Sequence, residues 1–441
     1  MDTIKKDYAK FTKGMKKTHT ILVPNMLPVH FELILSLFEQ KGYKFEILKS
    51  ADPALIETGL KYVHNDICYP CLLVIGQFID ALLSGRYDLS KIALAITQTG
   101  GGCRASNYIH LLRIALKNAG LSHIPVLSIN FSGMEKENSL KFSLSNLKRA
   151  RGAIVYSDML YMLANHYKSY EVNKGDTEKL LSHWTNKLKP MLKNTKYKTT
   201  KRVLGEIYRD FNYIKVDYVP KIRVGIVGEI YVKYSSLGNN NLEEFLRGED
   251  CETVVPGLMG FVTYCMANNV FDAKFYGRGK LMGLVYRLIL KSLDKWELLI
   301  KEAAGGDPRF CAPSGHRHLF KLTEGIIDLG VKMGEGWLLP AEMAELAEAG
   351  IPDIVCAQPF GCLPNHICGK SAIKRVKDLY PAANITPIDY DSSATRVNQE
   401  NRIKLMLAVA KERLTADEAV TEQNKVKNNA KGTKKQEKLV V

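Results

Sequence analysis

Short apolar runs alternate with segments of helical periodicity over the first third of the chain. Apolar strand patterns occur at 21–23, 45–48, 92–96 and 126–129, and helical patterns occur at 30–40, 71–83 and 105–119. Strands that alternate with helices in this way form parallel sheets covered by helices on both faces. We therefore expect an α/β domain at 19–139, preceded by a basic tail at 1–18.

The pattern changes after this domain and then returns. Residues 140–218 are rich in Leu, Lys and Tyr at helical spacing and carry few strand signals, so a helical connector is predicted there. Strand patterns resume at 223–227, 253–255, 354–355 and 385–388. They predict a second α/β domain at 219–415, followed by a disordered lysine-rich tail at 416–441. The expected fold is two Rossmann-like or flavodoxin-like parallel-sheet domains joined by a helical connector.

Length and composition agree with a multidomain globular protein. The chain has 441 residues, more than one hydrophobic core usually serves, with 46% hydrophobic and 24% charged residues. No apolar run reaches the roughly 18 residues that a membrane span needs. The first 20 residues lack the apolar core of a signal peptide. We expect a cytoplasmic protein without a membrane partner.

The formal net charge of +16 is concentrated in part at the ends of the chain. Residues 1–20 hold six Lys against two Asp, and residues 421–441 hold six Lys against two Glu, which is +4 at each end. Neither a zinc-finger spacing nor the arginine and aromatic pattern of an RNA-binding sheet is present. We expect no nucleic-acid partner, although an anionic small ligand such as a CoA ester could use part of this field.

Nine cysteines are clustered rather than spread evenly, which indicates a metal or redox role in a cytoplasmic protein. They are Cys68, Cys71, Cys103, Cys251, Cys265, Cys311, Cys356, Cys362 and Cys368. Cys68 and Cys71 form a C-x-x-C motif with Pro70 at a predicted helix start. A thiol there feels the positive helix end and is expected to deprotonate more easily. The motif alone leaves a redox dithiol, half a zinc site, a cluster ligand pair or two packed thiols open.

Two further loops deliver cysteine at strand ends. Cys103 follows three glycines after the strand at 92–96, and Cys356, Cys362 and Cys368 follow the strand at 354–355. Ligand sites in open α/β sheets lie at the carboxyl ends of strands. Gly369-Lys370-Ser371 imitates the end of a P-loop, but Pro364 stands where that motif needs glycine, so nucleotide binding is rejected.

Cysteines thus come from loops in both halves of the chain, which predicts one soft metal centre at the domain interface. An iron–sulfur cluster is favoured over zinc, which more often uses two short knuckles with tight spacing. Weaker signals are His316 and His318, the Gly334–Trp337 turn, and a helix start with Asn241 as its cap.

Six segments resemble the C-terminal portion of the large CoA-substrate-specific enzyme activases, which is similar to subunits of 2-hydroxyacyl-CoA dehydratases and benzoyl-CoA reductases. They include Gln98-Thr-Gly-Gly-Gly-Cys103-Arg-Ala-Ser and Cys356-Ala-Gln-Pro-Phe-Gly-Cys362-Leu-Pro-Asn-His. The others are 66–70, 224–232, 237–244 and 333–337, and the resemblance covers about 18–415.

The resemblance implies α/β domains around a 4Fe–4S cluster held by three cysteines. Some relatives carry a double-cubane 8Fe–9S cluster instead. Matched by motif, Cys68, Cys103 and Cys356 are the implied ligands, followed by Cys362, with Cys71 and Cys265 as further candidates for a larger cluster. The ATPase domains of the large activases have no counterpart in this sequence, so a separate ATP-hydrolysing activator of the actin-like ATPase class is the expected electron donor.

The implied function is therefore low-potential electron transfer to a 2-hydroxyacyl-CoA, or related reductive chemistry. Three alternatives stay open from the sequence: a non-enzymatic electron relay or regulatory partner of the activator, a double-cubane reductase of small molecules, and a zinc protein. A homodimer or heterodimer is also compatible with the resemblance.

Overall fold

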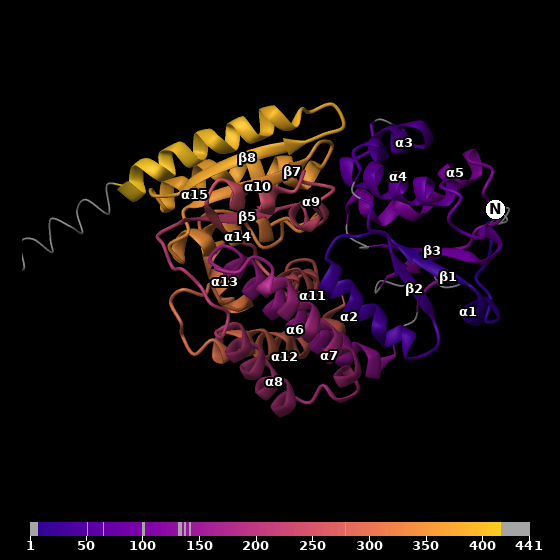
Figure 1. Cartoon of the computed structure of the whole chain (residues 1–441), viewed down its shortest axis with the longest axis horizontal. Coiled ribbons are helices and arrows are strands. Elements are labelled where there is room, and N and C mark those ends of the chain that lie inside the picture. The colour runs from indigo at the N-terminus through magenta and orange to yellow at the C-terminus, as the bar shows by residue number, and fades with distance from the viewer. Residues whose placement is uncertain are drawn as a thin grey trace, which may run out of the picture.

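The chain folds into two α/β units and a helical segment (Figure 1). In this computed structural model, the described residues are 8–50, 52–64, 66–98, 102–130, 135, 138–140, 143–277 and 279–415. Each unit contains a four-stranded sheet in which every strand pairing is parallel. The predicted class, α/β with two parallel sheets, is confirmed.

The first sheet has the strand order β2-β1-β3-β4. Its strands are β1 (Thr20–Val23), β2 (Lys44–Ile47), β3 (Ile92–Thr97) and β4 (Val126–Ile129). Strands β1 and β3 are nearly continuous apolar runs because helices cover both faces of the sheet centre. The helices of this unit are α1 (Met15–Thr18), α2 (Pro28–Glu39), α3 (Ala54–Tyr62), α4 (Tyr69–Leu83) and α5 (Tyr108–Asn118), with short 3-10 helices η1 (Leu89–Lys91) and η2 (Arg104–Asn107).

The second sheet has the order β6-β5-β7-β8. Its strands are β5 (Ile222–Gly228), β6 (Cys251–Val254), β7 (Asp353–Pro359) and β8 (Asn384–Tyr390). Counted within each unit, both sheets therefore have the same order, 2-1-3-4, although no sequence repeat indicates this. The direction of winding reverses between β1 and β3 and between β5 and β7, and ligands of open α/β sheets bind beside this reversal.

The helices of the second unit follow β5 in the chain. They are α9 (Ile230–Tyr234), α10 (Leu242–Gly248), α11 (Leu258–Phe275), α12 (Lys280–Ala303), α13 (His316–Leu322), α14 (Leu338–Glu348), the π-helical turn η4 (Asn365–Lys370), α15 (Ser371–Leu379) and a last helix at 396–415. Asn241 stands at the N-cap of α10, as predicted, with a positive φ of 58°. The side chain that accepts from Leu242 N, at 3.1 Å, is that of Asn239.

A helical segment lies between the two units in the chain. It comprises α6 (Leu144–Lys168), α7 (Asp176–Met191), η3 (Leu192–Asn194) and α8 (Tyr197–Phe211). Helix α6 contacts α2 of the first unit and α11, α12 and β6 of the second. It is therefore buried around most of its circumference, which ties the two α/β units to a shared helical core.

Asp158 of α6 joins all three parts through its carboxylate. Oδ1 lies 2.7 Å from His30 Nε2 of α2 and accepts from Leu258 N at 2.7 Å, while Oδ2 accepts from Met259 N at 2.9 Å. The two backbone donors belong to the first turn of α11, where N–H groups have no partner within the helix. One buried carboxylate thus caps α11 and fixes its position against both other segments.

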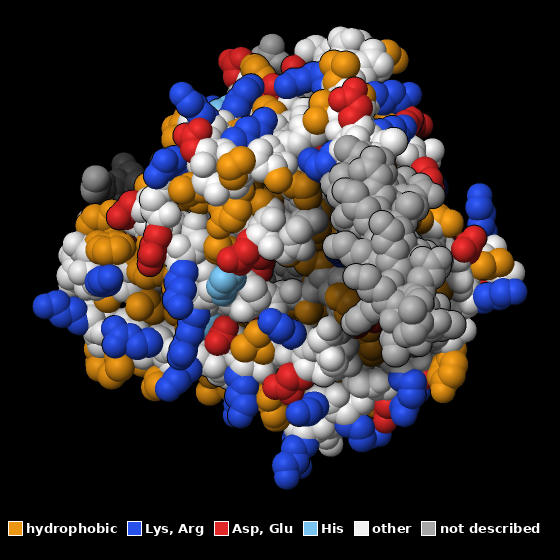
Figure 2. Space-filling view, turned by 90° about the vertical axis from the view of Figure 1, so that its left-hand side faces the viewer, with side chains coloured by type: hydrophobic (Ala, Val, Ile, Leu, Met, Phe, Trp, Pro, Cys, Tyr) orange, Lys and Arg blue, Asp and Glu red, His pale blue; other side chains and the backbone are white. Residues whose placement is uncertain are grey.

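The surface combines scattered basic groups with one exposed apolar helix face. Lys and Arg side chains are spread over the side of the molecule that carries α13 and α15 (Figure 2). On α12, Leu281, Leu284 and Leu288 are 77%, 53% and 65% exposed, at the spacing of a single helical stripe. Within the described part of the chain, no helix combines the length and apolar character needed to cross a bilayer.

Candidate metal centre

The two α/β units meet near the carboxyl ends of their strands. Tyr69 N at the start of α4 donates to Phe360 O, which follows β7, at 3.3 Å. Gly361 has a φ of 74°, and a Cβ at this position would lie 3.4 Å from Cys68 Cα. The absence of a side chain at Gly361 therefore lets the loop after β7 approach the Cys68 loop closely.

Cys68 stands at the N-cap of α4, as predicted, with Pro70 in the first turn. Its Sγ lies 2.8 Å from Tyr108 Oη at the start of α5, and the residue is 4% exposed. Burial raises the pKa of the Cys68 thiol above its usual value. The expected ease of deprotonation at the helix end is therefore outweighed by desolvation. Cys71, one turn on, is fully buried in the first unit, and burial likewise raises its pKa.

Cys103 precedes the 3-10 helix η2 and is partly exposed. The thiol pKa of Cys103 is raised to about 12. Burial is the largest cause, and the charges of Glu335, Glu229 and Cys68 contribute in the same direction. The preceding residue, Gly102, lies against the Met333 side chain of the second unit, which places the Cys103 loop at the interface. The glycines at 100 and 101 lie outside the described residues.

Cys356 and Cys362 occupy different environments although both follow the expected strand signal. Cys356 lies within β7, is fully buried, and its Sγ accepts from Gln358 Nε2 at 3.5 Å. Cys362 lies in the loop after β7, and its Sγ accepts from Asn365 Nδ2 at 3.3 Å.

The charges that act on these two thiols differ as well. Burial raises the pKa of Cys362, and Glu335 and Glu229 raise it further, as they do for Cys103. Burial also raises the pKa of Cys356, but the next influences come from other groups, Gln358 and Glu342. Gly361, next to Cys362, lies beside Cys68 Cα and beside the guanidinium of Arg104, which follows Cys103. The loops that carry Cys68, Cys103 and Cys362 therefore meet, whereas Cys356 lies within β7.

Two buried glutamates stand among these thiols and were not predicted as site residues. Glu229 follows β5 and caps α9, because its Oε2 accepts from Val232 N at 2.9 Å. Glu335 accepts from Ile230 N through Oε1 at 3.1 Å, and its buried Oε2 has no hydrogen-bond partner within the described segments. Burial, together with the Glu335 carboxyl, raises the pKa of Glu229 to about 8, and burial also raises the pKa of Glu335.

A two-glycine turn presents Glu335 to the interface. Gly334 and Gly336 have φ values of 59° and 37°, in the left-handed region that favours glycine. A Cβ at Gly334 would meet Pro364, and one at Gly336 would meet the carbonyl of Val331. The preceding Met333 side chain lies against Gly102, next to Cys103. The turn is therefore enclosed between the Cys103 loop and the Cys362 loop.

The remaining predicted metal candidates divide into near and distant groups. Burial raises the pKa of Cys265 on α11 and of Cys368 on η4, and the Glu335 charge adds to both shifts. Both thiols are therefore close enough to the site to feel its carboxyls. His316 and His318 pair separately with Asp294 and Glu348, so they form no joint metal site.

The donor chemistry of the site fits a soft metal centre. All nine cysteines are free, and thiolates prefer iron–sulfur clusters, zinc and copper(I). Among the described residues, no three His, Cys, Asp or Glu side chains are placed to hold a single metal ion.

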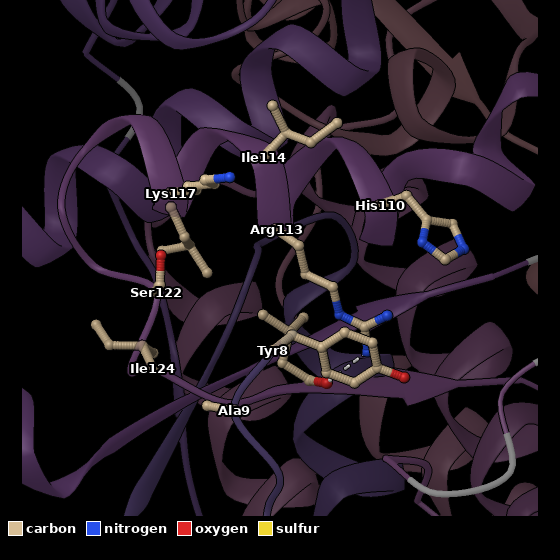
Figure 3. A pocket seen from close by; sticks show the side chains of 10 residues that line it. Tyr8, Ala9, His110, Arg113, Ile114, Lys117, Ser122 and Ile124 are labelled. Carbon is tan, nitrogen blue, oxygen red and sulfur yellow. Dashed lines mark hydrogen bonds between the residues drawn. The ribbon is translucent and has the colours of Figure 1, made fainter. Parts of the chain in front are cut away.

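One cavity has no cysteine in its lining. It has a volume of about 260 Å³ and is lined by the N-terminal segment and the later part of α5 (Figure 3). Within it, the Arg113 guanidinium lies 3.6 Å from the Tyr8 ring centroid and 3.1 Å from Glu135 Oε2. The guanidinium of Arg113 in this cavity is therefore already paired with Glu135 and Tyr8.

The raised pKa of Glu229 predicts a pH-dependent stability. A carboxyl that keeps its proton in the folded state stabilises the fold most below its ordinary pKa of 4.5, and this contribution is lost as pH rises to about 8. Metal-free Glu229→Gln protein should therefore lose less stability than wild type between pH 5 and 8. Urea unfolding midpoints across this range measure the difference, and parallel pH profiles would contradict it.

Neither family models nor curated proteins provide a relative of this chain. No protein-family model matches it. No curated protein matches it either.

Proposed function

We propose that the chain is an iron–sulfur protein of the 2-hydroxyacyl-CoA dehydratase and activase class. It would accept low-potential electrons from an ATP-hydrolysing activator and pass them to a substrate. The observation that carries this proposal is the meeting of the loops that carry Cys68, Cys103 and Cys362, from both α/β units, beside the turn that holds the buried Glu335.

The proposed ligands are Cys68, Cys103 and Cys362. This set differs from the one that the family resemblance implies, because Cys356 is enclosed in β7 and Cys362 faces the shared carboxyls. Tyr108 Oη and Asn365 Nδ2 lie within hydrogen-bond distance of two of these sulfurs. Hydrogen bonds to ligand sulfurs shift the reduction potential of a cluster, so these two side chains would tune it.

A bound cluster would supply one-electron reduction of the substrate at low potential. The protein contributes exclusion of water, because the three thiols lie in a largely buried interface. Glu229 would stay largely protonated near neutral pH, since burial raises its pKa to about 8. Neutral carboxyls avoid repulsion from the negative charge that thiolate ligands bring to the site.

A larger double-cubane cluster is the second candidate. Cys265 and Cys368 come from elements that carry none of the first three ligands, yet both feel the charge of Glu335. Additional thiols close to the site would suit a centre that reduces small molecules. Cys71 is the weaker addition because it packs inside the first unit.

We place the protein in the cytoplasm, where free thiols persist. Its proposed partner is a separate activator of the actin-like ATPase class, with neither nucleic acid nor membrane involved. A CoA thioester would be attracted by the net charge of +16.

The direct test is reduction followed by turnover. Anaerobically reconstituted protein is reduced with titanium(III) citrate and mixed with a panel of 2-hydroxyacyl-CoA thioesters. Formation of 2-enoyl-CoA would support the dehydratase function. Reduction of small molecules without dehydration would favour the double-cubane candidate, and a centre that cannot be reduced would contradict both.

A further inference from the structure

We propose that the Glu335 carboxylate is an oxygen ligand of the metal centre and fills a coordination position that the thiols leave open. This inference rests on the proposed function, because it concerns the same site. It adds a ligand of another chemical class to a set that cysteine motifs alone would define.

The first observation is that one carboxyl oxygen of Glu335 has no hydrogen-bond partner among the described residues. Glu335 is only 6% exposed, and its Oε1 accepts from Ile230 N at 3.1 Å. Its Oε2 is buried and has no partner among the described residues. A buried carboxyl oxygen without a donor is costly, because it has lost its hydration and gained nothing in return. A bound cation would provide the missing partner.

The second observation is the way the chain holds this side chain. Gly334 packs against Pro364 of the Cys362 loop, and Met333 packs against Gly102 of the Cys103 loop. Ile230, which fixes Oε1, directly follows Glu229 at the end of β5. Three neighbouring loops therefore determine where the carboxyl lies, and two of them carry proposed thiol ligands.

The third observation is the set of thiols that the carboxyl influences. The packing of Met333 on Gly102 and of Gly334 on Pro364 sets the turn beside the Cys103 and Cys362 loops, and a charged Glu335 raises the pKa of both thiols. Glu229 also raises both pKa values, but its Oε2 already accepts from Val232 N. Glu335 is thus the carboxyl better placed to bind metal.

Glu297 provides a matched control. It is 5% exposed, its Oε2 is also buried without a partner, and burial raises its pKa strongly. It lies on α12, where the charges that act on it belong to Glu345, Asp158 and Asp294. Substituting it tests the general effect of removing a buried carboxyl far from the thiols.

The experiment compares wild type, Glu335→Gln, Glu335→Asp and Glu297→Gln after anaerobic iron and sulfide reconstitution. We expect Glu335→Gln to change the Mössbauer parameters of one iron site and to lower bound iron at least twofold. Glu297→Gln should leave both unchanged. Without metal, both Gln variants should unfold at higher urea concentration than wild type, because each removes an unpartnered carboxylate.

The outcomes separate this inference from the proposed function. Wild-type spectra and iron content in both Glu335 variants would overturn the ligand role while leaving the iron–sulfur function intact. Lower stability of metal-free Glu335→Gln would also overturn it, since Oε2 would then have a partner in the protein. A wild type that takes up no iron would overturn the proposed function and this inference together. If Glu335→Gln fails to fold, Glu335→Asp carries the spectroscopic test.

Discussion

Cys362→Ala is expected to cost the protein most of its iron, whereas Cys356→Ala is expected to retain it. The two residues are six positions apart and both are buried, but only Cys362 lies in the loop that meets the first unit. Loss of a ligand removes a metal–sulfur bond, while loss of Cys356 removes a thiol from the core of the second sheet. Iron content and the visible spectrum after reconstitution measure the difference.

The pair of variants supplies its own control. Both changes remove one buried thiol, so general destabilisation should affect them similarly. Cys103→Ala is expected to behave like Cys362→Ala, because the same two carboxyls influence both thiols. Full iron retention in Cys362→Ala, or loss of iron only in Cys356→Ala, would contradict the proposed ligand set.

Asp158→Ala is expected to lower the free energy of unfolding by about 3–5 kcal/mol, the range found when one partner of a buried charged network is removed. The change leaves His30 Nε2 and the backbone N–H groups of Leu258 and Met259 without their acceptor. Because these donors belong to different parts of the chain, unfolding should lose cooperativity as well as stability. Urea unfolding followed by tryptophan fluorescence measures both.

The exposed Asp378 on α15 offers a comparison for this substitution. Asp378→Ala should change the free energy of unfolding by less than about 0.5 kcal/mol, as surface substitutions usually do. If Asp158→Ala changed stability as little as Asp378→Ala, the Asp158 carboxylate would not hold α2, α6 and α11 together.

Hydrophobic periodicity was enough to predict the two parallel sheets. Runs such as 92–96 are apolar throughout because they are buried on both faces, and this pattern is readable without tertiary information. Local polar detail was less predictable. Asn241 stands at the N-cap of α10 as predicted, but its backbone has a positive φ, and the side chain that accepts from Leu242 N is that of Asn239.

The same distinction applies to the candidate site. Cysteines at strand ends indicated the interface, but the strand signal at 354–355 did not reveal that β7 continues to Pro359. Cys356 was therefore expected in a loop, whereas it lies inside the sheet. Glu229 and Glu335 gave weaker signals, an acid directly after a strand and an acid between two glycines. Their importance depends on burial, which comes from the packing of both units.

The most direct test of the central claim is the iron and acid-labile sulfide content of anaerobically purified, reconstituted protein. We expect about four irons per chain with matching sulfide for a single cubane, or about eight irons for a double cubane. Dithionite should bleach the visible absorption in either case. Stoichiometric zinc, or no bound iron after reconstitution, would contradict the iron–sulfur assignment.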